Sequence, residues 1–357
     1  MNIAGKAFLE LVVCEVNYFC NIGIPNMRLK LYICSLLLYF LGMLSASAQD
    51  VAFSQFYANP LYLNPALAGS KICPRLTLNY RNAWPEINKG YVSYSAAYDL
   101  NVKAISGGIG FIADADVAGG GALNTYSASA IYSYRLQATR SLVINAALQA
   151  GYLQYRLNWD KLVFYDQIVP GTGEIMSSQE TPPSRLSVGD VDFSAGVLAG
   201  YNERLYLGAA LHHITMPDMA FYIGNTNRMN MRITIHGGAL IDVKQGLQDG
   251  EMGDLSFSPN IVYMQQGNFH QLNAGAYVNF FPFVGGLWFR HNFENPDALI
   301  VLLGFQQPRY KIGYSFDLTL SRVSLGGSGG AHEVSFAWQF DCPKKEFKYK
   351  AIKCPRF

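Results

Sequence analysis

The chain has 357 residues, and its 27 lysine and arginine against 25 aspartate and glutamate residues leave a formal net charge of only +2. This balance lacks the basic excess that is typical of nucleic-acid-binding proteins, so we expect no nucleic-acid partner. Half of the residues are hydrophobic and only 15% are charged, which excludes a disordered chain and is unusual for a soluble domain.

The amino end has the pattern of a secretory signal peptide. A nearly continuous apolar run covers residues 31–44, with two basic residues just before it and Ala46-Ser47-Ala48 after it. The run is too short for a helical membrane span, which needs about 20 residues. We therefore expect a cleaved leader over residues 1–48, with Met27 as the more suitable start. A genuine, unusually long leader is the alternative.

Residues 49–75 are predicted to form an extended, kinked segment ahead of the first strand. Its two Asn-Pro pairs interrupt regular structure, because proline fixes φ and disfavours helix in the residue before it. Its many aromatic residues make it too apolar to be fully exposed to water. The residues that follow predict a barrel, as described below. We expect this segment to pack at the periplasmic mouth of that barrel, inside its lumen or against a partner, and simple plugging of the barrel is the alternative to partner contact. Its candidate partner-binding residues are Phe53, Phe56, Tyr57, Asn59, Pro60, Asn64 and Pro65.

From Leu76 onward, apolar and polar residues alternate with a period of two, which indicates strands and not helices. Fourteen strands can be drawn, and their lengths suit outer-membrane strands, which need about 9–11 residues. Arg81 and Asp99 are expected to point into the lumen. The predicted strands are Leu76–Trp84, Tyr91–Leu100, Lys103–Asp114, Leu123–Leu136, Ser141–Asn158, Val191–Tyr201, Leu205–Ile214, Met231–Val243, Leu255–Gln265, His270–Phe280, Val284–Phe293, Ala298–Gln306, Tyr310–Leu320 and Ala331–Phe340.

Connection lengths support a membrane barrel over residues 76–340. Every second connection is short, as at 101–102, whereas the others include long loops such as 159–190, and this asymmetry is typical of outer-membrane barrels. Two connections fit poorly, because 244–254 is long on the short side and 266–269 is short on the long side. The predicted fold is therefore an all-β, transmembrane antiparallel barrel of about fourteen strands with both termini in the periplasm. A soluble β-sandwich or a propeller is the alternative.

Three cysteines follow the leader, namely Cys73, Cys342 and Cys354. Closure of the barrel would make the first and last strands antiparallel neighbours, so that Cys73 and Cys342 would meet at the periplasmic end of the seam. A disulfide between them is one possibility. The pairing of Cys342 with Cys354 is its rival, and three free thiols are the third.

The tail after the last strand, residues 341–357, contains six basic and two acidic residues. In the periplasm such a tail could contact an acidic partner or anionic lipid head groups. A solvated end without a partner is the alternative. Its candidate partner-binding residues are Lys344, Lys345, Lys348, Lys350, Lys353 and Arg356.

No pattern in the sequence points to catalysis, a metal or a cofactor. His212 and His213 are adjacent in a strand and so face opposite sides of it. Asp114, Asp116 and Gly119 loosely resemble a calcium loop, but the acidic residue at its twelfth position is missing, and we expect a polar outer loop there. The chain is therefore predicted to be no enzyme, with no cofactor and no small-molecule substrate.

Four stretches of the mature chain resemble the PorP/SprF family, the outer-membrane proteins of type IX secretion and gliding motility in Bacteroidetes. The most specific is the opening QDVAFSQFYANPLYLNPALAGS, residues 49–70. The others are YRNAWP at 80–85, FYDQI at 164–168 and HEVS at 332–335. Together these stretches span nearly the whole mature chain.

The resemblance implies an exported barrel of the Gram-negative outer membrane that docks or anchors secreted surface proteins, such as adhesins, and contacts the periplasmic ring of the secretion machine. Binding would use residues 49–75 and the basic tail on the inside and the loop 159–190 on the outside. The alternative function is a passive or substrate-specific porin.

Overall fold

The computed structural model describes residues 50–87, 90–168, 175–244, 254–293, 296–320 and 328–342. The chain divides into two units, residues 1–50 and 51–357, and the fold described below is that of the second. The predicted leader and the basic tail from residue 343 onward, with its six candidate residues, lie outside the described residues.

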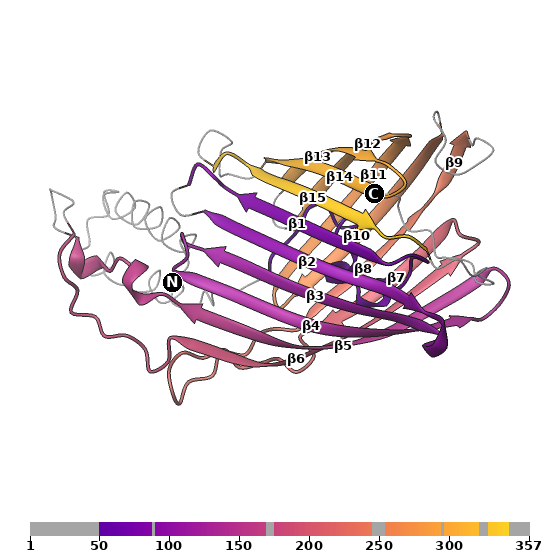
Figure 1. The fold of residues 1–357 in the computed structure, drawn as a ribbon. Coiled ribbons are helices and arrows are strands. Elements are labelled where there is room, and N and C mark those ends of the chain that lie inside the picture. The colour runs from indigo at the N-terminus through magenta and orange to yellow at the C-terminus, as the bar shows by residue number, and fades with distance from the viewer. Residues whose placement is uncertain are drawn as a thin grey trace, which may run out of the picture. The chain divides into compact units, whose positions relative to one another are not determined.

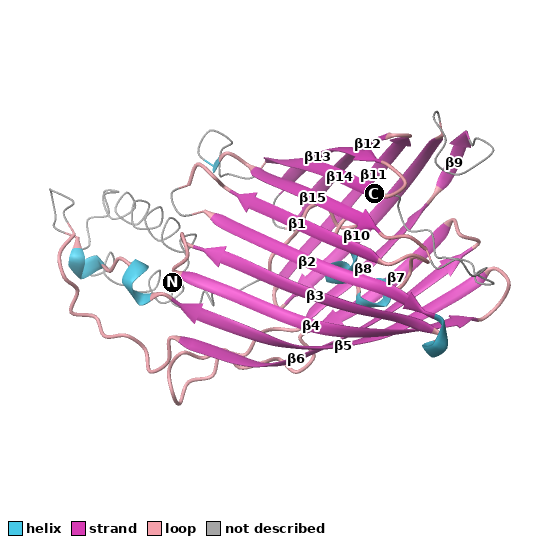
Figure 2. Ribbon diagram, viewed as in Figure 1, coloured by secondary structure: helices cyan, strands magenta, loops and turns pink. Residues whose placement is uncertain are grey.

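Fifteen strand segments form one antiparallel sheet that closes on itself (Figures 1 and 2). The strand β8 and the short strand β9 both pair with β10, so they act as one strand that is interrupted at Leu240. The segments are β1 (Arg75–Ala83), β2 (Tyr91–Val102), β3 (Gly107–Ala118), β4 (Leu123–Gln137), β5 (Leu142–Leu157), β6 (Ser187–Tyr201), β7 (Leu205–His212), β8 (Arg232–Ala239), β9 (Ile241–Lys244), β10 (Leu255–Gln266), β11 (Phe269–Phe280), β12 (Phe283–His291), β13 (Pro296–Gln306), β14 (Tyr310–Thr319) and β15 (Ala331–Gln339).

The ring closes where β1 pairs with β15, from Arg75 opposite Gln339 to Ala83 opposite Ala331. Because β8 and β9 count as one strand, the barrel has fourteen strands, and the predicted closed antiparallel barrel is confirmed. Closure leaves no sheet edge whose backbone groups would lack partners in hydrocarbon.

The two faces of the strands differ in the way that a membrane barrel requires. In β1, Thr77, Asn79 and Arg81 are buried and face the lumen, whereas Leu78 and Tyr80 alternate with them and are exposed. In β5, Leu148 is 69% exposed on the outer face. Apolar side chains therefore face outward and polar ones inward, which is the reverse of a soluble barrel.

Alternate connections lie at the same end of the barrel. We call the end that holds Arg75, Gln339 and the turns 202–204 and 307–309 the short-turn end. The opposite end carries the connections 158–186 and 213–231 and is called the long-loop end. This asymmetry agrees with the prediction from connection lengths.

The third strand begins four residues later than the sequence predicts. Lys103–Ile105 forms the short 3-10 helix η2, and Ser106 follows it with a left-handed backbone (φ 50°). The strand begins at Gly107, where a Cβ would overlap the carbonyl oxygen of Ser133. The prediction of a polar outer loop is wrong for Asp114 and Asp116, which lie within β3, whereas Gly119 lies in the turn that follows it.

The segment before β1 is not extended throughout, contrary to the prediction. It contains one helical turn, α3 (Pro60–Leu63), and the 3-10 turn η1 (Pro65–Leu67). Each turn has proline at its first position, where the fixed φ suits a helix and the missing N–H group is not needed. Asn-Pro pairs therefore start short turns here, and do not only interrupt structure.

Among the described residues, no helix is both long and apolar enough to cross a membrane.

Candidate functional site: the inner segment and the ends of the barrel

Residues 51–70, here called the inner segment, lie inside the barrel and contact its opposite walls. Phe56 packs on Trp288 of β12, with ring centroids 5.1 Å apart, and Tyr57 packs on Tyr206 of β7 at 5.8 Å. The Ala66 carbonyl accepts a hydrogen bond from Asn145 of β5. Contact with strands around the ring means that this segment fills the lumen as a plug.

The beginning of the inner segment is held by a buried cluster of charges near the long-loop end. Ser54 donates a hydrogen bond from its hydroxyl to Asp317 at 2.6 Å. The same hydroxyl accepts hydrogen bonds from Arg81 at 2.6 Å and from Arg290 at 2.7 Å. Both arginines also pair with Asp317, at 2.8 Å and 3.0 Å. One serine of the plug is therefore bound by charged residues of three wall strands.

Glu333 of β15 binds the backbone of the same stretch. Its carboxylate accepts hydrogen bonds from the N–H groups of Ser54 at 2.6 Å and Gln55 at 3.2 Å, and it pairs with Arg81 at 3.2 Å. The Gln55 side chain in turn donates to the Glu333 carbonyl and accepts from Ser335 at 2.5 Å. Two arginines and two carboxylates balance in charge here, as buried charges must.

Asn64 attaches the middle of the inner segment to the opposite wall. Its side-chain amide donates to the carbonyl of Val197 at 3.0 Å and lies 3.1 Å from Nε2 of His236. Its oxygen accepts from the Ala66 N–H, which caps η1. A Cβ at Gly196 or Gly208 would overlap the Asn64 amide or the His236 ring, so glycine is required at both wall positions.

The end of the inner segment is bound through its backbone. Ser133 donates to the carbonyl of Ala68 at 2.6 Å, and Arg135 donates to the carbonyl of Gly69 at 2.7 Å. Asp99 accepts from the Gly69 N–H at 2.9 Å, so Asp99 faces the lumen as predicted, and so does Arg81. Because these hydrogen bonds go to backbone groups, they hold this end of the segment in place independently of its side chains.

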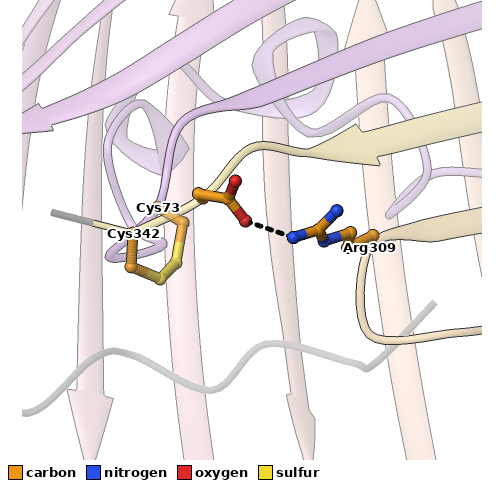
Figure 3. Close-up of a disulfide and its surroundings, with 4 residues drawn as sticks. Cys73, Arg309 and Cys342 are labelled. Atoms are coloured by element: carbon orange, nitrogen blue, oxygen red, sulfur yellow. Dashed lines mark hydrogen bonds and ion pairs between the residues drawn. A yellow bond between two sulfur atoms is a disulfide. The ribbon is translucent and has the colours of Figure 1, made fainter. Parts of the chain in front are cut away.

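A disulfide joins Cys73 to Cys342 at the short-turn end (Figure 3). Their Cα atoms are 4.6 Å apart, and the two residues precede β1 and follow β15. The bond links the chain just before β1 to the chain just after β15, where the barrel closes. It is one of the two pairings that the sequence leaves open. Beside it, Arg309 pairs with Asp341 at 2.8 Å.

The described ends of the chain lie at opposite ends of the barrel. Val51 accepts a hydrogen bond from Tyr62, and Tyr62 accepts one from Arg232, the first residue of β8 at the long-loop end. Cys342 lies at the short-turn end. The sheet itself begins and ends at the short-turn end, because Arg75 of β1 lies opposite Gln339 of β15, and the inner segment crosses the lumen before the first strand begins. That both termini lie in the periplasm stays a prediction.

The seven candidate partner-binding residues of the inner segment are buried inside the lumen, which agrees with the plugging alternative, and their contact with a partner stays a prediction. Their aromatic and amide side chains contact the wall of the barrel, as Phe56, Tyr57 and Asn64 show.

The wall residues Asp317 and Glu333, which bind the backbone and side chains of Ser54 and Gln55 beside them, were not predicted. In the sequence, each of them is visible only as a charged residue at an inward-facing position of a strand. This position does not show which residue it binds.

Two connections at the long-loop end are organised by carboxylates. Asp166, between β5 and β6, accepts hydrogen bonds from the Gln179 N–H at 2.7 Å and from Ser178, and these bonds hold the pKa of its carboxyl below the usual range. Asp218, between β7 and β8, accepts from the Ala220 and Asn227 N–H groups. Both loops are therefore shaped by local hydrogen bonds.

These two loops also contact each other and carry exposed apolar side chains. The Arg185 N–H donates to the Phe221 carbonyl at 3.0 Å and so joins them. Tyr165 is 87% exposed and Ile223 is 73% exposed. Large apolar side chains on ordered loops in water are typical of protein-binding surfaces.

No curated protein is significantly similar to this chain in sequence. Among solved structures, the toluene transporter TodX of P. putida is similar with a TM-score of 0.44 and 12% identity, over 79% of this chain and 94% of that one. The outer membrane protein Omp33 of Acinetobacter baumannii is similar with a TM-score of 0.41 and 9% identity, over 76% of this chain and all of that one.

The family model for the type IX secretion system membrane protein PorP/SprF matches residues 45–338. The match covers the inner segment and nearly the whole barrel, including the stretches that bind each other across the lumen. This chain therefore belongs to the PorP/SprF family of type IX secretion system membrane proteins.

Proposed function

We propose that this chain is a binding component of the type IX secretion machinery, and neither an enzyme nor a channel. In this proposal it sits in the outer membrane, holds a secreted surface protein such as an adhesin at its long-loop end, and contacts the periplasmic part of the machine at its short-turn end. The family membership supports a role in secretion. The assignment of sides follows the general rule that outer-membrane barrels have short periplasmic turns and long external loops.

The observation that carries the proposal is the filled lumen. Ser54, Asn64 and Gly69, at the beginning, the middle and the end of the plug, each lie within hydrogen-bond distance of a buried wall residue. These wall residues are Asp317, His236 and Asp99, respectively. Moving the plug out would break the hydrogen bonds that it makes with buried charged and polar groups of the wall, which is costly. A barrel closed in this way has its two ends free for binding, whereas its interior is occupied.

The joined loops at the long-loop end suit the docking of a surface protein. Tyr165 and Ile223 present exposed apolar area, and Asp166 and Asp218 hold the loops in shape without a partner. A preformed surface loses less conformational entropy on binding than a disordered one.

A gene deletion tests the role in secretion. The surface and secreted proteins of a strain that lacks this gene are compared with those of its parent strain. Loss of many exported proteins would indicate a core part of the machine, and loss of one or a few large surface proteins would indicate a dedicated docking partner. An unchanged set of exported proteins would contradict both and favour the porin alternative.

Changes to the loops test the docking surface. In a strain that carries the Tyr165→Ser and Ile223→Ser changes together, we expect less cargo at the cell surface and an unchanged amount of the barrel in the membrane. The matched control is Leu148→Ser on the lipid-facing wall, which leaves the loops intact. If the loop variant displays as much cargo as the unchanged protein, this surface does not bind the cargo.

A further inference from the structure

The outer wall of the barrel carries a groove of about 590 Å³ that crosses β4, β5, β6 and β7, which are consecutive neighbours in the sheet (Figure 1). Ala146, Ala195 and Ala209 line it with short, outward-facing side chains, and the longer side chains of Tyr134 and Leu148 border it. None of its lining residues is charged. Its volume lies within the range of sites for small molecules, about 300–1,000 Å³.

The groove lies directly behind the place where the plug is bound. On the inner face of the same wall, Gly196 and Gly208 leave room for the Asn64 amide and the His236 ring. Gly196 also lines the groove, so only the backbone of β6 separates the plug from the outer hollow there. Small residues on both faces therefore make the wall thin at this point, and a void on the membrane side would lose dispersion contacts.

The position of the groove along the wall places it among lipid acyl chains. Ala146 lies four residues from Leu142, where β5 begins, and Ala209 lies four residues from Leu205, where β7 begins. Both strands begin at the short-turn end. With a rise of about 3.4 Å per residue and a strand tilt near 45°, these alanines lie about 10 Å below the short turns. Because the hydrocarbon core is about 30 Å thick, this depth lies within the leaflet nearer to the short-turn end.

Two arginines flank the groove at the level of the lipid head groups. Arg140 lies in the turn between β4 and β5, Arg204 lies in the turn between β6 and β7, and both side chains are exposed. Among the described residues, neither arginine is paired with a carboxylate. Glu203, the acidic residue of these two turns, is half-buried, so the exposed charge there is positive. The turns are two strand spacings apart, or about 10 Å, and both long side chains can therefore reach a single phosphate.

We propose that the groove and the two arginines together bind one phospholipid. Its phosphate meets Arg140 and Arg204 through charge-assisted hydrogen bonds, and one of its acyl chains runs from there into the groove. The bound chain fills the hollow behind Gly196 and so supports the part of the wall that holds Asn64. The site itself does not depend on the proposed function, whereas the orientation proposed above assigns the lipid to the periplasmic leaflet.

A membrane protein fits this surface less well than a lipid does. Leu148, which borders the groove, is 69% exposed, so the flat wall of a second barrel would rest on it and would not reach the alanines. A flexible acyl chain is thin enough to follow the groove between such side chains. The exposed arginines on the adjoining turns also match a phosphate, which a purely apolar membrane segment lacks.

Lipid binding to the purified full-length protein tests the proposal. The barrel is kept in neutral detergent micelles at low salt and titrated with dioleoyl phosphatidylglycerol, and bound lipid is counted by native mass spectrometry. The matched probe is dioleoylglycerol, which has the same acyl chains and no phosphate. We expect the affinity for dioleoylglycerol to be at least about tenfold lower, since each hydrogen bond to a charged group is worth about a factor of ten. Equal affinity for the two lipids would overturn the proposal.

Changes to the two turns locate the head group. Arg140→Gln combined with Arg204→Gln is expected to weaken the binding of phosphatidylglycerol about tenfold or more and to leave that of dioleoylglycerol unchanged. The matched control is Arg156→Gln combined with Arg185→Gln, which removes two exposed arginines from the long-loop end. If this control weakens binding as much, general charge and not the two turns is responsible, and the proposal fails.

Changes to the groove locate the acyl chain. Ala209→Phe places a ring in the groove, so we expect both lipids to bind at least about fivefold more weakly, because several methylene contacts are lost. Ala274→Phe is the matched control, because Ala274 is an exposed residue of β11 that does not line the groove. Ala146→Leu repeats the test from β5 in case Ala209→Phe does not fold. Unchanged lipid binding in a folded groove variant would show that the chain does not lie there and would overturn the proposal.

Discussion

Ser54 and Asp317 are 263 residues apart in the chain, yet the hydroxyl of Ser54 lies 2.6 Å from the carboxylate of Asp317 inside the barrel. This contact joins the plug to β14, and Arg81 and Arg290 complete it. The charges of the wall balance one another, and the plug supplies hydrogen-bond partners that complete the cluster. The plug and the wall are therefore one folded unit.

The first prediction concerns Ser54. Ser54→Ala removes one hydroxyl that makes three hydrogen bonds to charged side chains, so we expect the free energy of unfolding to fall by about 1–3 kcal/mol. Chemical unfolding of the purified barrel measures it. The control is Ser184→Ala in an exposed loop, which we expect to change stability by less than about 0.5 kcal/mol. Equal effects in the two variants would contradict the role given to Ser54.

The second prediction concerns Gly196, beside Asn64. Gly196→Ala places a methyl group where the Asn64 amide now lies, so the plug must shift or the wall must bend. We expect a loss of about 1–3 kcal/mol in unfolding free energy, which is typical of overpacking. Gly285→Ala is the matched control in another strand, because its added Cβ would meet no atom within 4 Å. A neutral Gly196→Ala would mean that the plug is not seated as described.

The third prediction concerns the cysteines. Peptide mapping under non-reducing conditions should recover one linked pair of peptides that contains Cys73 and Cys342. Closing so long a loop restricts the unfolded chain, so Cys73→Ser should lower stability by a few kcal/mol. A linked pair that contains Cys342 and Cys354 instead would contradict the seam disulfide.

The fourth prediction concerns pH and the loop between β5 and β6. Hydrogen bonds from the Gln179 N–H and from Ser178 lower the pKa of Asp166 in the folded loop. A lowered pKa stabilises the loop above the ordinary aspartate pKa of about 3.9, and this stabilisation is lost as the pH falls through the lowered value. Hydrogen exchange at Gln179 should therefore accelerate in strong acid beyond the ordinary pH dependence. In Asp166→Asn this extra acceleration should be absent, and its persistence would exclude Asp166 as the cause.

Much of the barrel could be predicted from the sequence, because the period-two pattern is local. Strands such as β11 (Phe269–Phe280) and β14 (Tyr310–Thr319) lie within a residue of their predicted ranges. The start of β3 could not be predicted, because it depends on the close approach of Gly107 to Ser133 on the next strand. Side-chain alternation carries no information on such backbone contacts.

The site was harder to predict than the fold. The aromatic residues of the inner segment indicate that it must be shielded from water. They do not show whether a partner protein or the lumen of the barrel shields it. Its place is decided by long-range pairs such as Asn64 with Val197 and Gln55 with Glu333. A single sequence shows the members of such pairs and not their partners.

The central claim is that the inner segment closes the barrel, and conductance in planar lipid bilayers tests it most directly. We expect the wild-type protein to pass no steady current, and a variant that lacks residues 51–70 to pass an ohmic current if it folds. A steady ohmic conductance of the wild-type protein would contradict the account and would favour a porin.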